Sequence, residues 1–152
     1  GWRNLWQNVQ QTPRKLKGSV LNASKLGAIN VHPGILPAYR GSCCVEWAIY
    51  NDDQIGNTSH IMTEEYDAGA IIEIERYTFP QGTTYNEIRS EVYESAVQVM
   101  LRAVMDLVGN KYAGLAPQIQ EEGVLYPPIP DEQMGSVLRL IESGEYSFLT
   151  KG

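Results

Sequence analysis

The sequence lacks several features that mark other classes of protein. It has no uncharged apolar run of membrane-spanning length, and its first residues lack the apolar h-region of a signal peptide, so we expect no membrane partner. Its only cysteines, Cys43 and Cys44, are adjacent, which argues against a disulfide framework and is typical of a cytoplasmic protein. Twelve basic residues against 18 acidic ones give a net charge of −6, which argues against a nucleic-acid partner. It also has no glycine-rich phosphate-binding loop.

What is present predicts one α/β domain. The 152 residues suffice for a hydrophobic core. Helix-like and strand-like patterns alternate along the chain, which favours a sheet flanked by helices. In the longest expected helix, Glu87 follows Thr84 at capping-box spacing. The expected helices cover 14–25, 43–50, 84–108 and 131–143, and the expected strands cover 27–32, 57–64 and 70–77, with a loop at 33–42.

Polar side chains end the first expected strand. Asn30 and His32 are two residues apart, so on a strand they point to the same side, just before the Pro33-Gly34 turn. Ligands bind beyond the carboxyl ends of strands in open α/β sheets, which makes this pair a candidate site. If the flanking sequence is ignored, the simplest interpretation is that His32 is a core histidine and that Asn30 is a turn former.

Three other groups have simpler readings. Asp67 lies in an acidic loop between the second and third expected strands and, taken alone, would read as a loop cap. His60 lies within the second expected strand, as a structural residue or at the edge of the pocket. Cys43 and Cys44 have no third partner and are read as packing residues, so no metal site is expected.

Two blocks of sequence carry a family resemblance. Residues 30–41, Asn-Val-His-Pro-Gly-Ile-Leu-Pro-Ala-Tyr-Arg-Gly, resemble the signature of folate-dependent formyltransferases, and residues 56–69 resemble the second block of that superfamily. The resemblance implies a partial Rossmann-like domain with a mostly parallel sheet. Residues 1–110 would be the C-terminal portion of the catalytic domain, and residues 111–152 a proline-rich segment and a terminal helix packed on it.

The resemblance also implies roles for individual residues. The catalytic set would be Asn30, His32 and Asp67, with the Asn30 amide and a protonated His32 donating to the developing oxyanion, and with Asp67 raising the pKa of His32. The donor, 10-formyltetrahydrofolate, would contact Arg14, Lys15, Leu16, Met62, Thr63, Glu64, Glu65, Tyr66 and Gly69. The acceptor would lie near Pro33, Gly34, Ile35 and Arg40; Arg40 reads equally well as a solvated loop arginine.

The implied activity is formyl transfer to a primary amine, with an amino sugar as the preferred acceptor. Hydrolysis of the formyl-folate and a non-catalytic folate-binding or interaction module remain as alternatives. Only 26 residues precede the first expected strand, where the superfamily normally has several more strands. We expect the remaining sheet to be supplied by another segment, by a partner chain such as a second copy, or by residues outside this sequence.

Overall fold

The main sheet has three antiparallel strands. The computed structural model describes residues 18–21, 28–109, 115, 117–119 and 122–151. In this part of the chain the main sheet has the order β1-β3-β4. Its strands are β1 (Ile29–His32), β3 (Gly56–Ile61) and β4 (Ile71–Arg76). The α/β class is confirmed, but the expectation of a mostly parallel sheet is wrong for this sheet, because β1 and β4 both run antiparallel to β3.

Parallel pairing is confined to two short ladders in the described residues. The first joins β2 (Tyr39–Gly41) to β6 (Val124–Tyr126), and the second joins β5 (Phe79–Pro80) to β7 (Leu149–Thr150). The sequence did not predict these four strands, and β2 lies in the segment expected to be a loop. Strands of two or three residues are too short to show a period of two, so their pairing is decided by distant partners.

The described helices lie where the sequence placed them. They are α2 (Gly18–Leu21), α3 (Cys44–Tyr50), α4 (Tyr85–Val108) and α5 (Asp131–Glu142). The capping box at the start of α4 is confirmed, since Thr84 and Glu87 each bond the other's backbone N–H. Within the described residues, no helix combines the length and apolarity that crossing a membrane requires.

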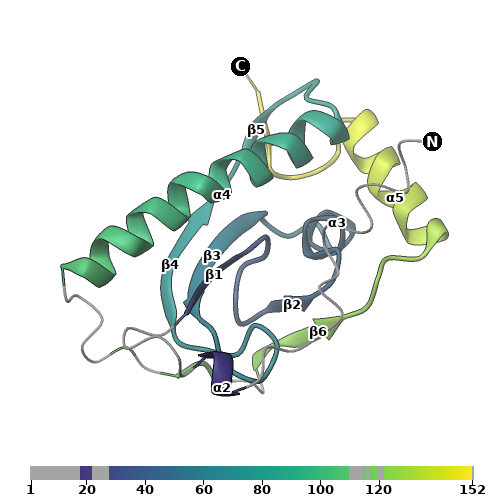
Figure 1. Ribbon diagram of the computed structural model, residues 1–152. Helices are drawn as coiled ribbons and strands as arrows, with labels where there is room; N and C mark the ends of the chain where they lie inside the picture. Colours follow the sequence, from purple (N-terminus) through teal and green to yellow (C-terminus); the bar gives the residue numbers. More distant parts are fainter. Residues whose placement is uncertain (1–17, 22–27, 110–114, 116, 120–121, 152) are drawn as a thin grey trace, which may run out of the picture.

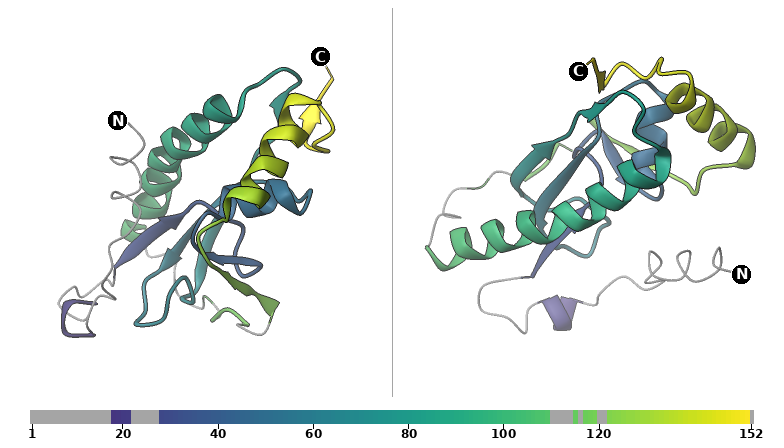
Figure 2. Two further views of the ribbon diagram at one scale, coloured as in Figure 1. Left: turned by 90° about the vertical axis from the view of Figure 1, so that its right-hand side faces the viewer. Right: turned by 90° about the horizontal axis from the view of Figure 1, so that it is seen from above.

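Helix α4 crosses one face of the main sheet, as Figures 1 and 2 show. Its inward stripe is fully buried and consists of Ile88, Val92, Val99 and Ala103. Ile88 and Val92 of this stripe share one hydrophobic core with residues of α3, of α5 and of the C-terminal end of the chain, including Ile49, Val137 and Tyr146. Helix α4 therefore covers the main sheet, α3 packs against α5 and β2, and His32 at the carboxyl end of β1 contacts Tyr39 of β2.

Strand β3 is buried although most of its side chains are polar. Asn57, Thr58, Ser59 and His60 are all at most 2% exposed. Burial of polar groups is tolerated when they form hydrogen bonds. The Thr58 hydroxyl donates to Gly34 O at 2.6 Å, and the Asn57 amide donates to Val92 O at 2.7 Å. Hydrogen bonds from β3 therefore hold the loop after β1 on one side of this strand and helix α4 on the other side.

Candidate active site

The pairing of β1 with β3 places Asn30 directly opposite His60. Asn30 Nδ2 lies 3.2 Å from His60 Nε2. His60 Nδ1 lies 3.0 Å from Ile61 O, a carbonyl that can only accept, so Nδ1 carries a proton. In the neutral ring Nε2 is then the acceptor, and the Asn30 amide donates to it.

His32 ends β1 and is 4% exposed. Its Nε2 donates to Tyr39 O at 2.8 Å, and its Nδ1 lies 3.5 Å from Asp67 Oδ2. Burial lowers the pKa of His32, and Asp67 and the Tyr39 carbonyl oppose that shift only in part. The resting imidazole is therefore neutral, with Nδ1 free to accept a proton beside a carboxylate.

Asp67 completes the cluster from the loop between β3 and β4. Its φ of 50° lies in the left-handed region, which turns its carboxylate back toward β1. Oδ2 accepts a hydrogen bond from Gly41 N at 3.0 Å, and Oδ1 lies 3.6 Å from His60 Nε2. The structure thus brings together Asn30, His32 and Asp67 as the sequence predicted, and adds His60 between them.

Of the residues predicted to contact the acceptor, Gly34 lies directly against His32. Gly34 is buried, and a Cβ on it would lie 2.7 Å from His32 Nε2 and 2.9 Å from Tyr39 O. Glycine here allows the His32–Tyr39 hydrogen bond to form. Ile35 packs beside Gly56 of β3, whereas Pro33 is half-buried in the turn. Arg40 Nε is buried and has no hydrogen-bond partner among the described residues.

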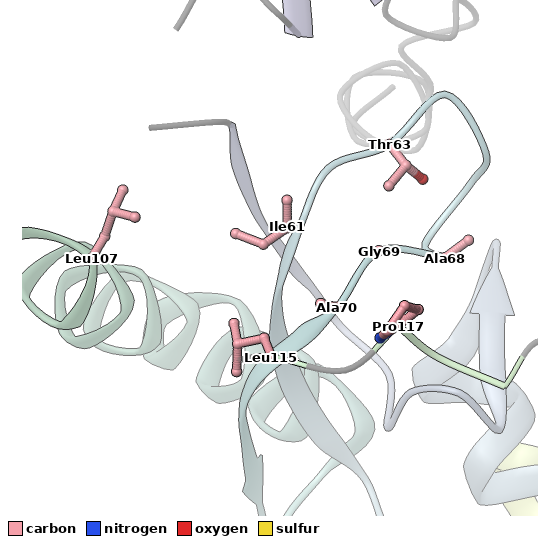
Figure 3. Close-up of a pocket in the computed structure, with 8 residues that line it drawn as sticks. All are labelled: Ile61, Thr63, Ala68, Gly69, Ala70, Leu107, Leu115 and Pro117. Carbon is pink, nitrogen blue, oxygen red and sulfur yellow. The ribbon is translucent and has the colours of Figure 1, made fainter. Parts of the chain in front are cut away.

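Part of the segment predicted to bind folate lines a cavity of about 450 Å³ next to Asp67. Figure 3 shows the cavity between the end of β3, the start of β4, the end of α4 and the residues Leu115 and Pro117. Thr63 and Gly69 line it, whereas Glu64, Glu65 and Tyr66 are exposed in the loop and Met62 is half-buried. The prediction for Arg14, Lys15 and Leu16 lies outside the described residues. The other lining residues are Ile61, Ala68, Ala70, Leu107, Leu115 and Pro117.

Two residues of the site were missed or undervalued in the sequence. His60 was read as structural or peripheral, although its place two residues after Thr58 puts it on the same side of β3 as a residue that bonds the loop after β1. Gln118 was not singled out. Its amide donates to Asp67 O at 2.9 Å and to Gly69 O, which lie about 50 residues away in the chain. No local sequence pattern predicts such a contact.

The two buried histidines should make folding sensitive to mild acid. Burial lowers the pKa of both His32 and His60 from the ordinary value of 6.5. Below that pH the unfolded chain binds protons that the native state does not, so the free energy of unfolding falls with pH. Between pH 7.5 and 5.5 we therefore expect the free energy of unfolding to decrease, with a contribution from each histidine.

Urea denaturation at a series of pH values measures this loss. In the variant His60→Gln the slope over the same interval should be about half that of the wild type. An unfolding free energy that stays constant from pH 7.5 to 5.5 would contradict the prediction.

Comparison with known proteins places the site in a family context. The sequence profile described as formyl transferase matches residues 13–104. The chain is 29% identical over 139 residues to methionyl-tRNA formyltransferase of Clostridium tetani, which covers 90% of this chain and 44% of that protein. It is 40% identical over 70 residues to GDP-perosamine N-formyltransferase of Brucella melitensis, which covers 45% of this chain and 27% of that protein.

Solved structures share the fold. A sugar N-formyltransferase from a Shewanella species is 26% identical with a TM-score of 0.58, over 77% of this chain and 46% of that one. The formyltransferase PseJ from Anoxybacillus kamchatkensis has a TM-score of 0.66 at 20% identity, over 88% of this chain and 68% of that one. The present chain spans less than half the length of the curated relatives described above.

Proposed function

The chain belongs to the formyl transferase family, and from that premise we propose that it transfers a formyl group from 10-formyltetrahydrofolate to the primary amine of a small molecule. The observation that carries the proposal is the cluster of a carboxamide, a neutral imidazole and a carboxylate at the end of β1. His32 Nδ1 lies 3.5 Å from Asp67 Oδ2, and Asn30 lies two residues before His32 on the same strand.

The cluster contains the groups that formyl transfer requires. The amine nitrogen bonds to the formyl carbon, the bond from that carbon to N10 breaks, and a proton passes from the amine to N10. His32 Nδ1 accepts this proton, Asp67 stabilises the resulting imidazolium, and the proton is then returned to the leaving nitrogen. An N–H of Asn30 donates to the oxygen as it becomes negative. No side chain has to act as a nucleophile.

The expectation that a protonated His32 donates to the developing oxyanion is revised in our proposal. Its Nε2–H is already used by Tyr39 O, and burial keeps the pKa of the ring below its ordinary value. In our proposal His32 starts neutral, and its Nδ1 becomes a proton donor only after it has taken the proton of the amine. The contribution of Asp67 raises the pKa, as expected from the sequence, but burial outweighs it.

The cavity beside Asp67 supports a folate donor. Its lining is mainly apolar, which suits a flat heteroaromatic ring, and it includes Ala68 and Gly69, the two residues that follow Asp67 in the chain. The crystal of PseJ contains tetrahydrofolate, and that of the sugar 3-N-formyltransferase WlaRD contains 5-N-formyl-tetrahydrofolate. These ligands support the assignment of 10-formyltetrahydrofolate as donor for this chain.

For the acceptor we favour an amino sugar over a tRNA. Among the similar proteins, GDP-perosamine N-formyltransferase and PseJ are named for, or crystallised with, nucleotide-linked sugars, whereas others are methionyl-tRNA formyltransferases. The net charge of −6 opposes the binding of a polyanion, because each phosphate contact requires a basic partner.

Turnover assays test the proposal. The protein is incubated with 10-formyltetrahydrofolate and a panel of amines that includes nucleotide-linked amino sugars and methionyl-tRNA, and release of tetrahydrofolate is followed. We expect release that depends on an amino sugar. Formate release without any amine would instead identify a hydrolase. Saturable folate binding without turnover would identify a binding module, and the absence of both would refute the proposal.

A further inference from the structure

His60 is a buried titratable group that the proposed reaction does not use. It is 2% exposed, and its ring contacts Asn30 on β1 and Asp67 in the following loop. Within the described residues, the Asn30 side chain forms one hydrogen bond, and its partner is His60. The carboxamide proposed to bind the oxyanion is thus held by a second histidine.

The geometry fixes the tautomer of His60. Nδ1 donates to Ile61 O at 3.0 Å, which leaves the lone pair of Nε2 facing Asn30 Nδ2 at 3.2 Å. His32 has the opposite arrangement, since its Nε2 donates to Tyr39 O. One ring therefore presents an acceptor to Asn30, whereas Nδ1 of the other ring is unprotonated and lies beside Asp67, where it can take the proton of the reacting amine.

On the basis of the proposed function, we infer that His60 is a positioning residue that sets the orientation of the Asn30 carboxamide. The two ends of a carboxamide have nearly the same shape, so a half-turn of the amide exchanges its oxygen and its nitrogen. With Nε2 of His60 as acceptor, the nitrogen lies toward β3 and retains a second N–H for the substrate. After a half-turn, an oxygen would occupy that place and would repel the developing negative charge.

The charged and titratable groups that face His60 are consistent with a neutral ring. They are Asp67 in the loop and His32 on β1. Burial lowers the pKa of His60 by more than Asp67 raises it, and His32 lowers it further. A proton on Nε2 would remove the acceptor for Asn30 and would draw Asp67 away from His32.

Kinetics of a matched pair of variants test the inference. His60→Leu removes the acceptor, whereas the amide of His60→Gln extends to the position of Nε2 and provides an oxygen there. We expect His60→Leu to lower kcat about tenfold with little change in KM, since one neutral hydrogen bond is lost. His60→Gln should stay within about twofold of the wild type. Equal losses in the two variants would overturn the inference.

A double-mutant cycle separates positioning from a general structural effect. In an Asn30→Ala background the acceptor has no amide to orient, so His60→Leu should cause no further loss of kcat. A tenfold loss in that background as well would overturn the inference, because His60 would then act through something other than Asn30.

Nitrogen NMR of the wild-type protein tests the same geometry without variants and without turnover. The chain has only two histidines, so their ring signals are few. We expect His60 to be protonated on Nδ1 and His32 on Nε2 at pH 7.5. An Nε2-protonated His60 would overturn the inference. Absence of formyl transfer in the wild type would refute the proposed function, and the tautomer would still show whether His60 can orient Asn30.

Discussion

Replacing His32 with glutamine should lower kcat/KM for formyl transfer by about 10³-fold, within the range expected for loss of a general base at an acyl-transfer site. The side-chain amide of glutamine still donates to Tyr39 O, so the local fold is kept. What it lacks is a nitrogen that can take the proton of the attacking amine next to Asp67, which lies 3.5 Å from His32 Nδ1. The measurement is steady-state release of tetrahydrofolate with the preferred amine.

Two controls make this result specific. Met105→Ala changes an exposed residue on α4, 73% accessible, and should leave kcat/KM unchanged. Titration of His32→Gln with tetrahydrofolate should give a dissociation constant within a few-fold of the wild type, because the imidazole acts on the proton and not on the folate ring. A folded His32→Gln protein that keeps a tenth or more of the activity would contradict the mechanism.

Substitution of Gly69 with alanine should destabilise the protein by about 4 kcal/mol, the scale of a severe backbone clash in a buried turn. A Cβ at this position would lie 1.7 Å from Ile61 O and 2.7 Å from Ile61 C. Both are backbone atoms of β3 and cannot rotate away. Relief of the clash requires the loop that carries Asp67 to separate from β3, so activity should fall together with stability.

Helix α5 provides the matched control. Gly135 lies inside this helix, where the nearest atom to an added Cβ is the terminal nitrogen of Arg139 at 3.4 Å. Alanine is the better helix former, so Gly135→Ala should be neutral or stabilising by up to about 1 kcal/mol. Chemical denaturation of both variants measures the difference. A Gly69→Ala protein as stable as Gly135→Ala would show that the contact between the loop and β3 is not tight.

The sequence predictions were accurate where a feature depends on residues close together in the chain, and they failed where it depends on distant residues. Helix α4 was placed to within one residue at its start, because the capping box of Thr84 and Glu87 is complete within four residues. Strand direction was predicted wrongly. Parallel and antiparallel neighbours leave no distinct mark on a strand as short as β1, and the resemblance suggested a parallel sheet.

The burial of β3 illustrates a second limit of prediction from sequence. Asn57, Thr58 and Ser59 would be assigned to a partly exposed strand by composition, yet each is fully buried. Their hydrogen-bond partners lie at least 14 residues away, at Val92, Gly34 and Glu73. A polar strand can be central only when such partners exist, and the partners become visible only in the folded chain.

The sequence by itself determined the α/β class, the approximate bounds of α3, α4 and α5, and a set of catalytic candidates spread over two blocks of chain. These depend on periodicity, on helix caps and on a local signature, all of which are short-range. Only the tertiary structure decided that the sheet is antiparallel, that His60 lies between Asn30 and Asp67, and that Gln118 supports the loop of Asp67. The physical reason is that hydrogen bonds between distant residues are selected by the closure of the whole chain, which no local pattern encodes.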